Sequence, residues 1–305
     1  MISFIKKYTL LVAMVIGIAG YKWFSLLINY TPIMIFAMLL LTFSKIDIKN
    51  LKPQWFQFWL LLFEIGFSTA IYYIVMSLHF IEIRERQILA QGAMICVMCP
   101  TATAAAVVTG KLGGNIAATA AYTLFANIAV AIAAPLLFPL MSDKDIIFTD
   151  LFFKILKTVF LLLICPFLIV FAIRFFMPKL QKKIENVNGL AFYIWAICLI
   201  IAIAKVAQML IEENYGGKIE LLLGAISLIL CVLQFFVGKI IGGKYGERIA
   251  GGQALGQKNT ILAVWLAQQY LNPISAVAAG AYIVWQNVIN SWQLYLRQKK
   301  LEVRN

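Results

Sequence analysis

The feature that most constrains this chain is a series of apolar runs, most of about 20 residues, separated by short stretches rich in charge, glycine or proline. A run of that length is what an α-helix needs to cross the hydrocarbon core of a bilayer. With 63% hydrophobic residues, the composition also exceeds what a soluble domain carries. The sequence therefore predicts an all-α, multi-pass membrane protein. We read ten segments: 8–28, 31–44, 55–78, 87–109, 115–141, 151–176, 189–211, 219–242, 249–270 and 273–296.

The net charge of +13 is spread singly along the chain rather than gathered on one face. This distribution argues against nucleic-acid binding and indicates membrane topology instead. If both termini are cytoplasmic, seventeen basic residues fall on the inner side and five on the outer side. Because cytoplasmic loops are enriched in Lys and Arg, we expect both termini inside and a location in the inner (cytoplasmic) membrane.

Few side chains are suited to catalysis or to binding a metal. The five cysteines lie inside apolar segments, and the single histidine, His79, lies at a helix end with no nucleophile motif around it. Cys96 and Cys99 form a C-x-x-C pair without a second pair or a nearby histidine, so packing is the favoured interpretation. A channel would need a filter loop or a continuous polar stripe, and neither is visible. We therefore predict no enzyme activity, no cofactor and no protein partner.

Two of the segments are interrupted by helix-breaking and polar residues. One contains CPTATAAAVVTGKLGGN (99–115) and the other contains GQKNTILAVWLAQQYLN (256–272), and four positions are identical at an offset of 157 residues. Five spans in each half would insert the halves in opposite senses, which is the inverted-repeat plan of secondary transporters. We therefore predict two five-helix repeats, residues 1–145 and 146–305, with broken spans four and nine crossing near the middle of the membrane.

These motifs resemble the bile acid:sodium symporter family. The similarity covers nearly the whole chain and includes TPIMIFAMLLLTF, CPTATAAAVVTGKLGGN, GQALGQKNT and VWQNVINS. It implies a core of spans three to five and eight to ten, in which spans four and nine cross, and a panel of spans one, two, six and seven. It also implies sodium-coupled uptake of organic anions, with two sodium sites behind the crossing and the substrate between core and panel.

The chain departs from the family pattern where the resemblance places the sodium ligands. A Ser-Asn pair in span four is replaced by Ala105 and Ala106, and the glutamate of span nine that both sites share is replaced by Gln253. Two side-chain oxygens and a negative charge are lost from these positions. We predict a degenerate ion site and leave open whether it binds sodium. Its residues are Glu64, Ala105, Ala106, Thr119, Thr123, Gln253, Gln257 and Lys258.

Lys258 stands where the family has an asparagine, inside a half-polar membrane segment. A lysine near the bilayer centre costs roughly 2.5–3.5 kcal/mol on insertion scales, so it needs a partner or a function. We interpret its ammonium as a fixed replacement for a sodium ion, which would weaken or remove sodium coupling. The alternatives are a conventional sodium symporter and a lysine that snorkels or neutralises a structural carboxylate.

Glu64 is the one acidic residue well inside an apolar span, and it is the natural partner for Lys258. The family's span-three glutamine aligns either with Glu64 or, one turn later, with Ser68. The pair would be either a static ion pair or a couple that exchanges a proton. We expect the ammonium within about 4 Å of a carboxylate or of backbone carbonyls that the broken helices leave unpaired.

The predicted substrate is a small or amphipathic carboxylate, and the lipid bilayer is the only other partner. Small residues, hydroxyls and one positive charge near the broken helices suit such an anion without ranking the candidates. The predicted substrate-binding residues are Thr101, Thr103, Lys258, Asn259, Thr260 and Asn287.

Overall fold

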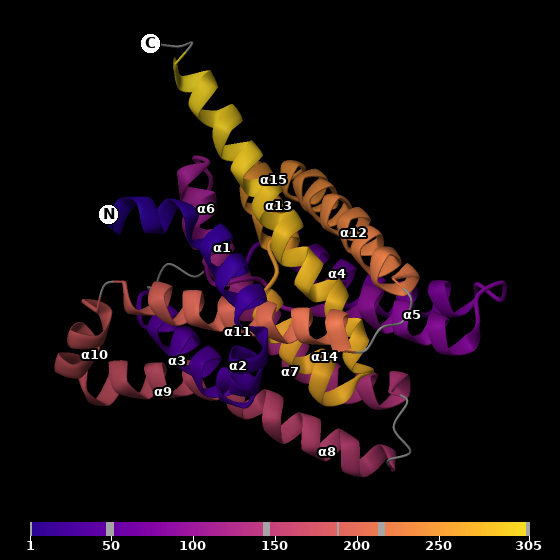
Figure 1. The fold of residues 1–305 in the computed structure, drawn as a ribbon. Helices are drawn as coiled ribbons and strands as arrows, with labels where there is room; N and C mark the ends of the chain where they lie inside the picture. The colour runs from indigo at the N-terminus through magenta and orange to yellow at the C-terminus, as the bar shows by residue number, and fades with distance from the viewer. Residues whose placement is uncertain (1, 47–51, 143–146, 188, 213–216, 303–305) are drawn as a thin grey trace.

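The computed structural model describes residues 2–46, 52–142, 147–187, 189–212 and 217–302. Apart from one isolated bridge, all regular structure in these residues is helical (Figure 1). The elements are α1 (Ile2–Ala19), α2 (Tyr21–Phe24), η1 (Ser25–Tyr30), α3 (Thr31–Ser44), α4 (Trp55–Met76), α5 (Ile83–Met98), α6 (Ala105–Lys111), α7 (Ile116–Met141), α8 (Phe148–Val159), η3 (Phe160–Ile164), α9 (Cys165–Phe176), α10 (Pro178–Glu185), α11 (Leu190–Glu212), α12 (Lys218–Gly243), α13 (Arg248–Gly256), α14 (Thr260–Tyr270), η4 (Pro273–Ser275) and α15 (Ala276–Glu302).

Six helices are long and apolar enough to cross a membrane, and they correspond to predicted segments two, three and five to eight. They are Tyr21–Ser44, Trp55–Met76, Ile116–Met141, Phe148–Phe176, Leu190–Glu212 and Lys218–Gly243. The other four segments are shorter, split or more polar: the apolar part of α1 is Thr9–Ala19, segments four and nine are each broken, and α15 ends in a charged stretch. The chain is a multi-pass membrane protein.

The boundary between the first two predicted segments was wrong. The sequence pattern puts this boundary between residues 28 and 31, next to Pro32. The structure instead breaks the helix at Gly20 and runs without interruption from Tyr21 to Ser44. The turn before the proline tightens into the 3₁₀ helix η1, which lets the chain pass a residue without an N–H group. The second span is therefore longer than its sequence pattern suggested.

The breaks in segments four and nine have local causes. Pro100 has no N–H group and disfavours helical geometry at the residue before it, so α5 ends at Met98 and Cys99 is extended. In segment nine, α13 ends at Gly256 and Gln257 is extended. The following helix, α14, is capped by Asn259, whose side chain accepts a hydrogen bond from the Leu262 N–H group.

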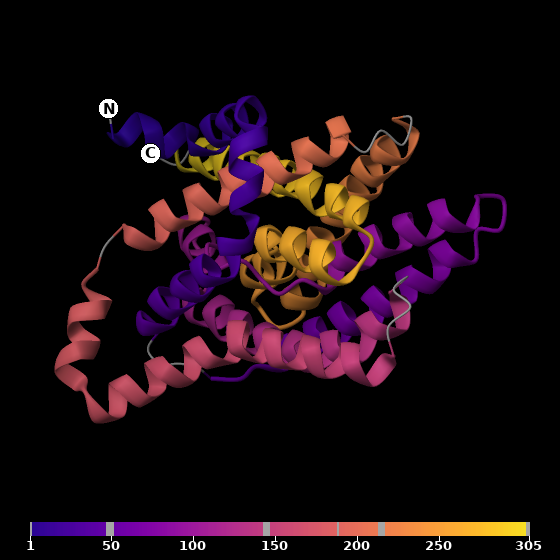
Figure 2. The same cartoon turned by 60° about the horizontal axis from the view of Figure 1, so that its bottom comes forward.

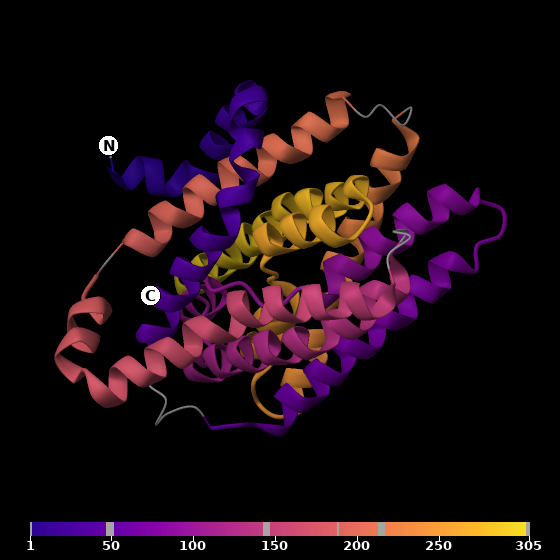
Figure 3. The same ribbon diagram turned by 90° about the horizontal axis from the view of Figure 1, so that it is seen from below.

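The helices form two groups that pack against each other. In the first group, α11 contacts α1 and α3, and α3 contacts α9. In the second, α4 packs on α5, and α12 packs on α5, α13 and α15. Figures 2 and 3 show α11 and the α8–α9 helix on opposite sides, with the chain from α13 to α15 between them. The broken segments thus lie in the interior of the molecule.

The ends of the helices show which connections share a side. In all three ribbon views, α1 begins and α15 ends at the end of the molecule that carries α10, and the turn between α4 and α5 lies at the opposite end (Figures 1 to 3). The start of α1 and the end of α15 therefore lie on one side, which agrees with the predicted even number of spans. That this side is the cytoplasm stays a prediction from charge.

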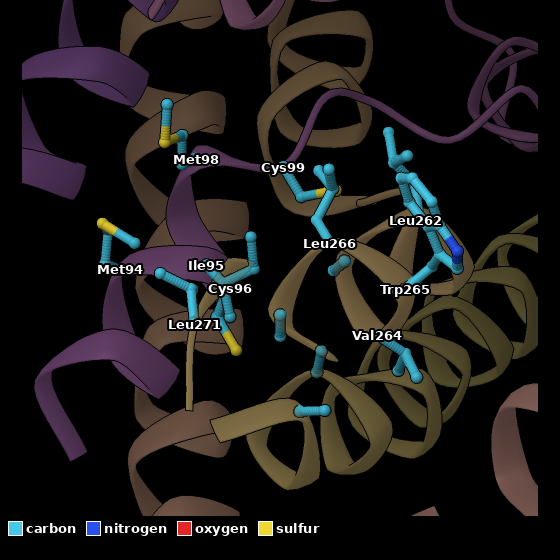
Figure 4. Packing of buried hydrophobic residues seen from close by; sticks show 14 of the residues in the cluster. Met94, Ile95, Cys96, Met98, Cys99, Leu262, Val264, Trp265, Leu266 and Leu271 are labelled. Atoms are coloured by element: carbon cyan, nitrogen blue, oxygen red, sulfur yellow. The ribbon is translucent and has the colours of Figure 1, made fainter. Parts of the chain in front are cut away.

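The core around the broken helices is apolar and closely packed. Figure 4 shows side chains of α5, among them Ile95 and Cys96, beside Leu266 of α14 and Leu271 just beyond it. All four are at most 2% exposed, and they belong to one continuous cluster. This packing holds the interrupted stretches in fixed positions, since interior side chains interlock at crystal-like density.

Helices α12 and α13 approach each other through glycines. A Cβ atom built on Gly238 would lie within 3.0 Å of the Gly251 carbonyl oxygen, and one on Gly242 would lie equally close to the Glu247 carbonyl oxygen. Real Cβ atoms essentially never come so close to a backbone oxygen. The close approach of backbones at small residues is typical of helix pairs in membranes.

We expect Gly238→Ala to lower the free energy of unfolding by about 1–3 kcal/mol, because the added methyl group overpacks the α12–α13 contact. Thermal unfolding of the purified protein would measure this loss. Gly224→Ala is the matched control, since it lies in the same helix and a Cβ atom there meets nothing within 4 Å. Equal losses in the two variants would contradict the packing argument.

Candidate functional site

The two helix breaks meet in the interior of the protein. Thr101 and Lys258 form an isolated antiparallel bridge between the interrupted stretches. The Ala102 N–H group donates to the Gln257 carbonyl at 2.8 Å, and the Asn259 N–H group donates to the Pro100 carbonyl at 2.8 Å. Backbone groups that left their helices are thereby partly satisfied by one another, as a non-aqueous interior requires.

The bridge relates positions that are equivalent under the offset of 157 residues. Thr101 pairs with Lys258, which lies 157 residues later, and exchanging each residue for its equivalent converts one backbone hydrogen bond into the other. A second equivalent pair has the same local role, because the Asn115 and Asn272 side chains each cap the next helical element.

Lys258 ends in a buried ion pair. Its Nζ atom lies 2.8 Å from Oε1 of Glu64, and the two side chains are 1% and 0% exposed. The Tyr122 hydroxyl donates to the other carboxylate oxygen of Glu64. The ammonium therefore lies within the expected distance of a carboxylate and does not face lipid. Ser68, the other position to which the family's span-three glutamine aligns, donates to the Ile65 carbonyl of its own helix.

Three separate elements meet in this pair: α4 carries Glu64, α7 carries Tyr122, and the break between α13 and α14 carries Lys258. Removing one partner of a buried ion pair typically costs 3–5 kcal/mol, because the other charge is left without compensation. Replacing both partners by neutral groups costs far less. The pair therefore fixes the position of the break relative to α4 without being an inherently strong source of stability.

We expect Tyr122→Phe to lower the free energy of unfolding by about 1.5–3 kcal/mol, because a hydrogen bond to a charged group is lost in the interior. Thermal unfolding in detergent would measure the change. The control is Tyr73→Phe, a 56%-exposed tyrosine on α4. If both variants unfold like the unmodified protein, the hydroxyl does not stabilise the Glu64 carboxylate.

On the α13 side of the break, two buried amide groups have side-chain oxygens without a hydrogen-bond partner among the described residues. Gln253 donates through Nε2 to Oδ1 of Asn290 at 3.0 Å, but its Oε1 atom has no hydrogen-bond partner. Oε1 of Gln257 is likewise buried and without a partner. Amide oxygens are among the hard ligands that cations such as sodium accept. These two atoms are therefore buried acceptors that a cation could use.

Comparison with known sequences assigns the family. The sequence model described as "Sodium Bile acid symporter family" matches residues 32–213, more than half of the chain. The chain belongs to the sodium bile acid symporter family. A relative from Bacillus subtilis (strain 168), named "Uncharacterized sodium-dependent transporter YocS", is 23% identical over 222 residues, which cover 70% of this chain and 66% of the relative. The chain thus spans just under two thirds of that relative's length.

Of the positions predicted for the degenerate ion site of this family member, those in span four carry no side-chain oxygen, and those in span five are threonines with hydrogen-bond partners. Ala105 is buried and Ala106 is half-buried, and neither has a side-chain oxygen. Thr119 Oγ1 lies 3.0 Å from Oγ1 of Thr109, and Thr123 donates to the Thr119 carbonyl at 3.0 Å. The remaining hydroxyls are thus engaged with their own surroundings.

The predicted substrate residues lie at or beside the breaks, with one exception. Thr101 donates to Ala254 O, Asn259 caps α14, and Thr103 is half-buried just beyond the bridge. Asn287 lies on α15 instead, where its side chain donates to the carbonyl of Ile283 in the same helix.

Three residues of the site were not among the predicted site residues. Gln286 accepts from the Lys258 N–H group at 2.9 Å and donates to Oγ1 of Thr260 at 3.4 Å. Asn290 accepts a hydrogen bond from the Gln253 side chain, and Tyr122 donates one to the Glu64 carboxylate. A signal was available for Gln286 and Asn290, because both are amides inside the last apolar segment, four residues apart on one helix face. A lone tyrosine such as Tyr122 gives no comparable signal.

Proposed function

We propose that this protein is a secondary active transporter of an organic anion that works by alternating access and does not need sodium. The observation that carries the proposal is the buried Lys258–Glu64 pair beside the two helix breaks. The Lys258 ammonium takes the place of the sodium ion that the family resemblance implies, and it is covalently attached to the chain. A fixed ammonium can hold the broken helices together electrostatically without an ion from solution.

The charges of the site support this reading. In the family pattern a glutamate of span nine and a glutamine of span three serve the sodium sites. Here span nine carries Gln253, whereas span three carries Glu64. The site therefore keeps one carboxylate, supplied by span three instead of span nine. One positive and one negative charge remain, which is the balance that one of the two sodium ions and the shared glutamate would give. Neutrality matters because an uncompensated charge in the interior is expensive.

The exchange of backbone hydrogen bonds at the bridge supports an inverted repeat of two five-helix halves. An antiparallel bridge has a local two-fold axis, and an inverted repeat needs such an axis in the membrane plane. The bridge joins two residues that are 157 positions apart, and its two backbone hydrogen bonds join the residues next to them. The proposed halves meet near residues 143–146, which lie outside the described residues.

Lys258 is assigned to the ion-replacing role rather than to the substrate. Its ammonium is enclosed and already paired with Glu64, so a substrate carboxylate would have to displace a partner. The half-buried Thr103, next to the breaks, remains a candidate contact for a small or amphipathic carboxylate. We place the protein in the inner membrane with cytoplasmic termini, on the evidence of its charge distribution.

A conventional sodium symporter is the second candidate. The Gln253 and Gln257 side-chain oxygens favour it, since buried acceptors without a partner among the described residues are suited to a cation. The name of the Bacillus relative also describes a sodium-dependent transporter.

Uptake into proteoliposomes tests the proposal. Purified protein would be reconstituted and given a panel of labelled carboxylates, chosen by thermal-shift screening, with either sodium or choline outside. We expect uptake of at least one anion to persist in choline. Uptake that depends steeply on sodium would establish the second candidate, and no uptake of any anion would argue against both.

A further inference from the structure

A cavity of about 420 Å³ lies where α12 ends and α13 begins, at the end of α13 that is opposite to the helix break. Its lining combines cationic side chains, apolar side chains and glycines. Lys239, Lys244 and Arg248 supply three positive charges, and Phe236 and Ile240 supply the apolar side chains. Glycines form the rest of the wall, which leaves room beside the charged groups.

The three cations have no anionic partner in the part of the chain that the structure describes. None of them forms an ion pair there, and the nearest acidic residue in sequence, Glu247, accepts a hydrogen bond from Nδ2 of Asn115 at 2.7 Å. Three like charges gathered without compensation repel one another. A bound anion would remove that repulsion.

The position of Lys239 is set by packing. A Cβ atom on Gly252 would lie within 3.0 Å of Cγ of Lys239, so the lysine stem lies across that glycine. Lys244 and Arg248 are exposed on either side of the turn that joins the two helices. The α12–α13 contact therefore presents the three basic groups together at the end of a membrane-spanning helix.

An apolar stripe leads from the cavity along α12. Ile229, Val232, Phe236 and Ile240 are 64%, 51%, 60% and 46% exposed, and their spacing places them on one helix face. In a membrane-spanning helix such a face contacts acyl chains. The stripe ends at the basic cavity, so a molecule with an apolar chain and an anionic head fits both parts at once.

We propose that this cavity binds the headgroup of an anionic phospholipid, with its acyl chains along the α12 stripe. The basic groups would bind the phosphate, and the stripe distinguishes a lipid from free phosphate. A lipid bound there would clamp the ends of α12 and α13, the hairpin that carries Gln253 towards the site. The proposal is independent of the transported substrate and of the coupling ion.

Thermal unfolding in detergent tests it. Phosphatidylglycerol should raise the unfolding temperature, whereas phosphatidylcholine with the same acyl chains, or inorganic phosphate alone, should not. The triple variant Lys239→Gln/Lys244→Gln/Arg248→Gln should lose the effect. Each basic residue near a lipid headgroup contributes about a fivefold factor in affinity, so we expect phosphatidylglycerol to bind the variant about 100-fold more weakly.

A matched variant controls for total charge. Lys182→Gln/Lys299→Gln/Lys300→Gln removes three exposed lysines from α10 and α15 and should keep the response. Native mass spectrometry of the unmodified protein gives a second readout that does not depend on variant folding, and it should retain phosphatidylglycerol in preference to phosphatidylcholine. An equal response in both triple variants, a full response to phosphate alone, or no lipid preference would overturn the proposal.

Discussion

We expect Lys258→Met to abolish anion uptake and to lower the unfolding temperature of the purified protein. The substitution removes the ammonium and leaves the fully buried Glu64 carboxylate without its counter-ion. Breaking a buried ion pair costs on the order of 3–5 kcal/mol, which corresponds to a shift of roughly 5–15 °C for a chain of this length. Proteoliposome uptake and thermal unfolding in detergent measure the two effects separately.

A double variant separates the structural role of the pair from its role in transport. Lys258→Met combined with Glu64→Gln leaves no buried charge, so we expect most of the lost stability to return. Uptake should remain absent, because the fixed cation that replaces sodium is still missing. Lys154→Met, which removes an exposed lysine from α8, controls for the loss of a lysine alone. Normal uptake by Lys258→Met would show that the lysine is only structural.

The sequence was sufficient for the elements that depend on apolar length and on helix-breaking residues. Six apolar segments correspond to long helices, and Pro100 and Gly256 mark the ends of α5 and α13. These features are local, because a bilayer sets the length of a span and a proline acts on its immediate neighbours. The predicted boundary between the first two segments was wrong for a local reason too, since a 3₁₀ turn lets the helix continue past Pro32.

The partners within the site were harder to predict, because they depend on how helices rotate against each other. The sequence suggested Glu64 as the partner of Lys258, but it left open whether Glu64 or Ser68 matches the family's span-three glutamine, and the contact itself depends on the packing of α4 on α7 and on the break. Asn287 and Gln286 are adjacent in sequence but point to different surroundings. Neighbouring residues of a helix differ by about 100° in direction, so a small rotation decides which one enters a site.

The ion-replacement hypothesis makes its sharpest prediction for a variant that restores the family pattern. Glu64→Gln, Gln253→Glu and Lys258→Asn together return the carboxylate to span nine and remove the fixed cation. Sodium should then bind and stabilise the folded state, by about 2.7 kcal/mol at a concentration 100-fold above its Kd. The unfolding temperature of the triple variant should rise with sodium chloride but not with choline chloride, whereas that of the unmodified protein should respond equally to both salts.

Two further features make this experiment decisive. Ala105 and Ala106 remain in span four, so only one of the family's two sodium sites regains its ligands, and the sodium response should saturate as a single site. Glu64→Gln combined with Gln253→Glu is the control, because it returns the carboxylate to span nine but keeps the Lys258 ammonium as its one counter-ion. A sodium response in that double variant, or in the unmodified protein, would mean that the ammonium does not exclude the ion. No sodium response in the triple variant would mean that the ammonium does not replace sodium in this site.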